Sequence, residues 1–160
     1  GYAALQSNCA SLNTAVGTQT LQDNTTGVSN IGLGAYSLKS NTTGSWNTAL
    51  GTSALYCNTT GSYNVAVGQC ALCANTSGYQ NVAVGQNSLS SNTIGCNNTA
   101  LGQTALQSNI SGTWNTAVGA GSMVSNTISI SSEGEKAFSV ISEEVVMRSR
   151  RIFFSFTSLA

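Results

Sequence analysis

The chain has 160 residues, of which only 6% are charged, and its formal net charge at pH 7 is zero. An ordinary globular domain carries about 25% charged residues, and this chain has no basic surface to hold nucleic acid or an anionic membrane. Histidine is absent, which excludes Ser-His-Asp and Cys-His triads. No apolar run reaches the ~18 residues of a membrane helix. We therefore expect no enzyme, no nucleic-acid partner and no membrane insertion.

A 17-residue repeat organises residues 1–127. Each unit has an asparagine, a glycine four residues later and a leucine or methionine eight residues later. A short fixed period means that one structural unit is stacked on copies of itself. Seventeen residues are too few for the helix pairs of α-solenoids, which need about 33 or more. The sequence therefore predicts an all-β fold, namely a β-solenoid (β-roll) with one coil per repeat.

Each repeat contains a short alternating segment, such as Asn-Val-Ala-Val-Gly at 64–68. Because side chains alternate across a strand, Val65 and Val67 share one face and Ala66 takes the other. We expect the aliphatic position of Val67 to face the core, together with the leucine of a second short strand at 53–55. The predicted core consists of Val16, Leu21, Leu33, Leu38, Leu50, Leu55, Val67, Leu72, Val84, Leu89, Leu101, Leu106, Val118 and Met123.

The middle position of the first strand is small in every repeat. One interpretation is close approach of another backbone, such as that of a neighbouring chain, and the other is simple relief of crowding. The first interpretation makes a candidate interface of Ala49, Ala66, Ala83 and Ala100.

The first asparagine of each repeat predicts a ladder, because stacked asparagine amides bond from coil to coil. Its members are Asn13, Asn30, Asn47, Asn64, Asn81, Asn98 and Asn115. The repeated glycines fall in turns, where φ is positive or where backbone segments pass closely. N-x-S/T sequons largely follow from the Asn-Thr-Thr part of the repeat and stand at Asn24, Asn41, Asn58, Asn75, Asn97 and Asn109.

Trp46, Tyr63 and Trp114 share the last position of the repeat and are expected along one edge. Aromatic side chains placed in this way stack on sugars, form a subunit contact, or are ordinary isolated surface residues. Surface glycans and a host receptor are therefore candidate partners, beside further copies of the chain.

Five cysteines are present, so at least one is free or bonded to another chain. Cys57 and Cys73 are one residue short of a full period apart, which makes them diagonal neighbours and a candidate disulfide. The Cys70-x-x-Cys73 motif lacks the second ligand pair of a zinc site. We expect neither a metal nor another cofactor.

The repeat stops near Ile128, and eight of the ten charged residues follow it. Ser132 and Glu135 fit a capping box, and Glu144 and Arg148 have the spacing of a helical ion pair. We expect a helix over about 133–150, then an extended apolar segment. Residues 128–160 form a second unit that caps the last coil, trimerises the chain or donates a strand.

These motifs resemble known repeats. Residues 47–63, which read Asn-Thr-Ala-Leu-Gly through Asn-Thr-Thr-Gly-Ser-Tyr, resemble repeats of phage tail-fibre-like and trimeric adhesin-like proteins, found before endosialidase-type chaperone domains. Residues 64–68 resemble the head repeat of YadA-type trimeric autotransporter adhesins. The resemblance covers about residues 1–127. It implies a β-roll that assembles as a homotrimer on an extracellular or virion fibre.

The expected function is that of a structural or adhesive module of such a fibre, outside the cell, on its surface or on a virion. A head-to-tail self-assembling filament is the alternative. An ice-binding solenoid is the third interpretation, because Thr26, Thr43 and Thr60 stack. Against it, these threonines lie in predicted turns and a flat T-x-T strand face is missing.

Overall fold

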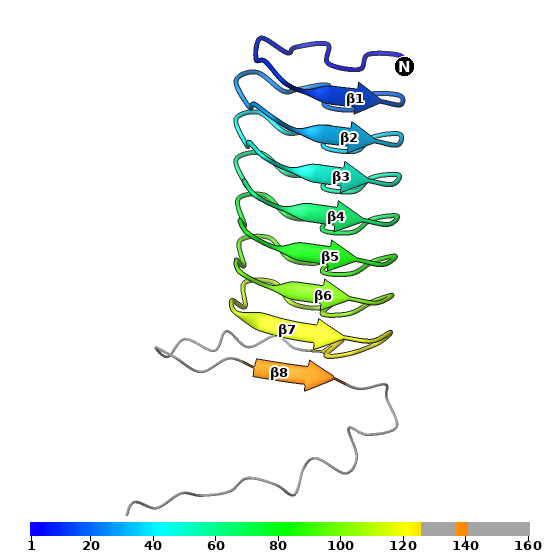
Figure 1. Ribbon diagram of the computed structural model, residues 1–160, viewed down its shortest axis with the longest axis vertical. Coiled ribbons are helices and arrows are strands. Elements are labelled where there is room, and N and C mark those ends of the chain that lie inside the picture. Colours follow the sequence, from blue (N-terminus) through cyan, green and yellow to red (C-terminus); the bar gives the residue numbers. More distant parts are fainter. Residues whose placement is uncertain (126–136, 141–160) are drawn as a thin grey trace, which may run out of the picture.

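The computed structural model describes residues 1–125 and 137–140, and it is a rod of stacked coils (Figure 1). Each coil contributes one strand to a single parallel sheet. From the first to the seventh strand, partners are 17 residues apart, as in Ala49↔Ala66. The predicted all-β solenoid is confirmed. Its strands are β1 (Thr14–Val16), β2 (Ile31–Leu33), β3 (Thr48–Leu50), β4 (Val65–Val67), β5 (Val82–Val84), β6 (Thr99–Leu101), β7 (Asn115–Val118) and β8 (Ala137–Val140).

The core lies between the sheet and the segment of each coil that returns from it. From that segment come six fully buried leucines, with Met123 packed against the cluster. From the sheet comes a column of fully buried alanines. The leucines are Leu21, Leu38, Leu55, Leu72, Leu89 and Leu106, and the alanines are Ala49, Ala66, Ala83, Ala100 and Ala117.

The prediction that the aliphatic strand position faces the core is wrong. Val16, Leu33, Val84 and Leu101 are exposed, and Leu50, Val67 and Val118 are only half-buried. The interpretation of Ala49, Ala66, Ala83 and Ala100 as an interface is wrong for the same reason, since these side chains point inward. The interior of each coil is narrow, and the leucine of the returning segment fills most of it. The inward position of the strand therefore has room only for a methyl group.

The predicted second strand at 53–55 is also wrong, because this segment is a turn in which the sign of φ alternates. Gly51, Ser53 and Leu55 have φ of 134°, 58° and 52°. Because left-handed and right-handed residues alternate in this turn, its peptide N–H and C=O groups point along the axis of the rod. The N–H of Ser53 donates to the Ala35 carbonyl of one neighbouring coil (2.9 Å), and that of Leu55 to the Ala71 carbonyl of the other (3.0 Å). A left-handed residue costs about 1–2 kcal/mol, which burial of the leucine, about 1.5–3 kcal/mol, offsets.

Two columns of asparagine join the coils by amide hydrogen bonds. In the predicted ladder, Asn47 donates its Nδ2–H to the Gly61 carbonyl (2.8 Å) and to Asn30 Oδ1 (3.1 Å). Its own Oδ1 accepts the backbone N–H of Asn64 (3.0 Å). In the second column, Asn58 Nδ2–H donates to Asn41 Oδ1 (2.7 Å) and to Gly61. Of the ladder, Asn13 is half-buried, and Asn30, Asn47, Asn64, Asn81, Asn98 and Asn115 are fully buried.

The C-terminal strand β8 pairs in parallel with β7, with Ser139 opposite Ala117. The predicted helix over 133–150 is therefore wrong at 137–140, and its remaining residues lie outside the described ranges, as does the expected unit boundary near residue 127. Without β8, the outer edge of β7 would present unpaired N–H and C=O groups. The segment Ala-Phe-Ser-Val satisfies them, and this tertiary pairing outweighs local helix propensity.

Candidate functional site

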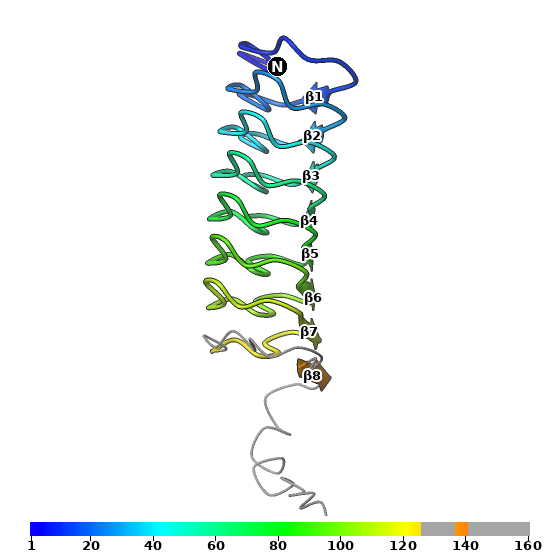
Figure 2. The same ribbon diagram turned by 90° about the vertical axis from the view of Figure 1, so that its left-hand side faces the viewer.

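One side of the rod is a flat sheet surface, which we call the outer strand face. Figure 2 shows β1–β7 stacked along that side. Its outward side chains form two columns of threonine, valine, isoleucine and leucine, none of them charged. With about 4.8 Å between strands and about 3.3 Å per residue, the face is roughly 35 Å by 10 Å. The columns are Thr14, Ile31, Thr48, Val65, Val82, Thr99 and Thr116, and Val16, Leu33, Leu50, Val67, Val84, Leu101 and Val118.

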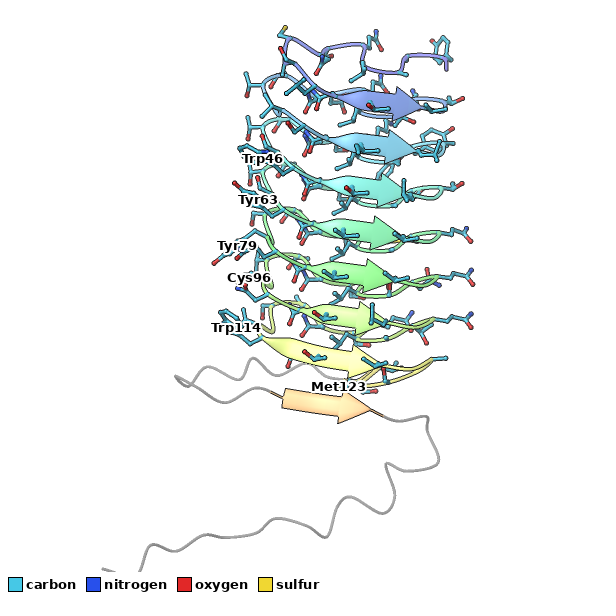
Figure 3. All side chains as sticks on the ribbon, in the orientation of Figure 1. Trp46, Tyr63, Tyr79, Cys96, Trp114 and Met123 are labelled. Atoms are coloured by element: carbon cyan, nitrogen blue, oxygen red, sulfur yellow. A yellow bond between two sulfur atoms is a disulfide. The ribbon has the colours of Figure 1, made fainter. Side chains whose placement is uncertain are left out.

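An adjoining edge of the rod carries aromatic side chains, and we call Trp46, Tyr63, Tyr79 and Trp114 the aromatic edge (Figure 3). Trp46 stacks on Tyr63 with ring centroids 4.9 Å apart and planes 4° from parallel. All four rings are about half exposed. Backbone φ of 56°, 61° and 62° at Trp46, Tyr63 and Trp114 shows that each stands at the same left-handed corner before a strand.

Sequence reasoning placed Trp46, Tyr63 and Trp114 on this edge but missed Tyr79. The reason is that Tyr79 stands one position earlier in its repeat, directly after Gly78, where the two preceding repeats have a serine. The signal that could have found it is an aromatic residue within two positions after the second glycine, which four of the six repeats with that glycine have.

An open pocket of about 400 Å³ lies on the aromatic edge between two coils. Aromatic rings, hydroxyl groups and one side-chain amide line it. Its residues are Thr60, Ser62, Tyr63, Ser77, Tyr79 and Gln80.

Tyr79 has a neutral phenol next to this pocket. A side-chain hydrogen bond with Cys96 raises the pKa of Tyr79 above its ordinary value of 10.0, and the charge interaction with the same cysteine acts in the same direction. The hydroxyl is protonated at neutral pH, as it would be even at the ordinary pKa of 10.0, and it both donates and accepts hydrogen bonds.

The candidate Cys57–Cys73 disulfide does not form, because the cysteines pair differently. Cys73 does lie beside Cys57, whose N–H donates to the Cys73 carbonyl (3.0 Å). However, Cys73 is bonded to Cys70 in its own coil, where the turn brings the two Cα atoms to 4.8 Å, within the usual range for a disulfide. Cys9, Cys57 and Cys96 are free thiols. Cys57 and the disulfide line a second surface pocket of about 310 Å³.

The repeat asparagines are poor glycan acceptors in the folded chain. Five of the six sequon side chains are fully buried in the second asparagine column, and the one at Asn97 is half-buried. Attachment to the buried five would require the coil to open. They are Asn24, Asn41, Asn58, Asn75 and Asn109.

In the part of the chain that the structure describes, no three histidine, cysteine or acidic side chains cluster as metal ligands do. The same ranges hold no helix of the length and apolar character needed to cross a membrane. Comparison of the chain with protein-family models, with curated proteins and with solved structures finds no match.

Proposed function

We propose that the chain is a structural and adhesive module of an extracellular or virion fibre, and that it assembles as a homotrimer through its outer strand face. The observation that carries the proposal is this flat, uncharged and largely apolar face, on which the side chains of Ile31, Leu33 and Leu101 are exposed to solvent. Contiguous apolar patches of several hundred Å² on soluble monomers often mark interaction sites. The three-fold assembly and the location outside the cell follow the resemblance to tail-fibre and adhesin repeats.

The repeat itself makes copies of the chain suitable partners for one another. Each copy presents the same two columns at the same coil spacing, so that one face matches another over all seven strands. Uncharged side chains bring no like-charge repulsion when two such faces meet. Sheets whose faces carry side chains of this kind pack face to face at a separation of about 10 Å.

The size of the face suits an assembly that grows stronger with coil number. Roughly 350 Å² per chain is less than the about 800 Å² per partner of a standard stable interface. The contact must therefore extend beyond the two columns, over the turn that follows each strand on the side away from the aromatic edge. Because each coil contributes a similar area, a longer stack holds its partners more tightly.

A head-to-tail filament receives less support, because β8 of the same chain covers the edge of β7 that a second chain would occupy. Ice binding is the second candidate, since the outer strand face is flat and carries threonine. Its threonine column is interrupted by Ile31, Val65 and Val82, which weakens any match to a regular water lattice. A thermal hysteresis measurement tests it directly. The outward threonines are Thr14, Thr48, Thr99 and Thr116.

We do not propose catalysis, because the repeats contain no histidine and a single carboxylate, Asp23.

The test is sedimentation velocity of the wild-type chain and of a variant with Val67→Lys and Val84→Lys. Both side chains point outward, so that lysine leaves the coil folded and puts charge where subunits meet. We expect a trimer to become a monomer with an unchanged circular dichroism spectrum. Thr43→Lys, at an exposed turn, is the control and should stay trimeric. A monomeric wild type, or a lysine variant that still trimerises, would contradict the proposal.

A further inference from the structure

We propose that the pocket between Tyr63 and Tyr79 is a binding site for a neutral saccharide. This rests on the proposed adhesive function, for which it names the class of ligand and the residues that hold it.

The first argument is that the stack of aromatic rings along this edge ends at Tyr63. Trp46 and Tyr63 occupy the same place in successive coils and stack at 4.9 Å, which is the coil spacing. In the next coil that place belongs to Gln80, so no ring of this column covers the other face of Tyr63. The pocket lies at this point. Aromatic faces carry negative charge and attract the positively polarised C–H edges of a ring placed on them, and a sugar ring presents such C–H groups.

The second argument is the set of polar groups around the rings. Thr60, Ser62 and Ser77 supply hydroxyls, and Gln80 supplies an amide. These groups and the protonated phenol of Tyr79 both donate and accept hydrogen bonds, as the hydroxyls of a sugar do. Because Thr60, Ser77 and Gln80 are exposed, a purely apolar ligand would cover their polar groups without pairing them, at a cost in affinity.

The third argument is the absence of charge. The six residues lining the pocket include no aspartate, glutamate, lysine, arginine or histidine. Between residues 13 and 125 the charged side chains are Asp23 and Lys39, which belong to the first coils of the rod. An anionic sugar would find no cation here, so that a neutral saccharide fits better than a sialylated one.

The pocket is also preformed and of suitable size. About 400 Å³ falls in the range of small-ligand sites, roughly 300–1,000 Å³. Tyr63 is held by its stacking on Trp46, and Ser62 by accepting the backbone N–H of Ser45 (3.0 Å). Little freedom is therefore lost when a ligand binds.

The experiment is a glycan array followed by calorimetry on the intact particle. The probes are cello-, chito-, manno- and galacto-oligosaccharides, with sialyllactose as the anionic comparison. We expect at least one neutral oligosaccharide to bind. Tyr63→Ala and Tyr79→Ala should each weaken that binding about tenfold or more, because each removes a stacking surface. Trp114→Ala is the matched control, since it removes an equally exposed ring of the same edge outside the pocket.

Five results would overturn the proposal: no binding of any neutral probe, binding of sialyllactose alone, unchanged affinity in both tyrosine variants, an equal loss in Trp114→Ala, or a loss of both binding and trimer mass in the tyrosine variants. Sedimentation of the same samples separates this from the fibre proposal. A trimer that binds no saccharide refutes the pocket and leaves assembly intact. A monomer that binds saccharide through Tyr63 and Tyr79 does the reverse. Tyrosine variants that lose both binding and trimer mass would make the aromatic edge a subunit contact, and would also refute the pocket.

Discussion

At the scale of the residue, the width of the coil decides which side chains fit. Gly32 takes the inward place that alanine holds in β1 and in β3 to β7. A methyl group there would come within 2.5 Å of Thr20 Cγ2. Thr20 is itself buried at a place where Ala54 and Ala71 stand in later coils. The larger threonine and the smaller glycine therefore compensate for one another across the core.

This compensation predicts the behaviour of Gly32→Ala. The added methyl overlaps Thr20 in a packed core, which costs about 1–3 kcal/mol of unfolding free energy. Thr20→Ala should restore much of that loss in the double variant, despite removing its hydrogen bond to the Gly34 carbonyl. Urea denaturation of the four chains measures the coupling, and additive effects of the two substitutions would contradict the contact.

A second residue-scale prediction compares two leucines of one coil. Leu106 is fully buried, whereas Leu101 is 37% exposed on the outer strand face. Leu106→Ala should lower the free energy of unfolding by about 2–5 kcal/mol. Leu101→Ala should cost well under half of this when both are measured in the monomeric lysine variant. Equal losses of unfolding free energy, or a larger loss at Leu101, would mean that the aliphatic strand position belongs to the core.

At the scale of the element, the asparagine ladder couples each coil to the next. Asn64 donates to Gly78 and Asn47, and its Oδ1 accepts from the backbone N–H of Asn81. Asn64→Ala leaves buried groups without partners, each at about 1–3 kcal/mol. Chemical denaturation should show a loss in that range or above, against almost none for the exposed Gln69→Ala. Comparable stability of the two variants would argue against a structural role for the ladder.

The period of the sequence was sufficient to predict the coil, the strand of each repeat and the stacking of asparagines. It was not sufficient to predict the direction of the strand. Alternation shows that the side chains of Val65 and Val67 lie on the same face of the strand. Which face points into the core depends on the side chains of the returning segment opposite the strand. The left-handed conformation of Leu55 gives no sequence signal, because leucine rarely adopts it. The pairing of β8 depends on the open edge of β7, which local propensity cannot show.

Of the candidate site, the sequence indicated the aromatic column and missed the pocket. Trp46 and Tyr63 were found because they keep the period, whereas Tyr79 breaks it by one position. The pocket depends on that departure and on Gln80 in place of a ring. A periodic pattern therefore predicts the scaffold better than it predicts the local irregularities that suit a ligand.

At the scale of the whole molecule, the solenoid divides its surfaces between two proposed tasks. The outer strand face is flat, uncharged and repeated from β1 to β7, which suits contact between copies of the chain. The aromatic edge carries half-exposed rings and a pocket lined by rings and polar residues, which suits a ligand from outside. Because each coil contacts mainly its neighbours, the same division extends along any number of coils.

The most direct measurement is an electron cryomicroscopy reconstruction of the purified particle at a resolution that separates the coils. We expect three parallel solenoids whose outer strand faces meet around the common axis. Tyr63 and Tyr79 should lie on the outside, open to solvent. A particle containing a single solenoid, or one whose chains pack through the aromatic edge while the outer strand face remains in water, would contradict the proposed assembly.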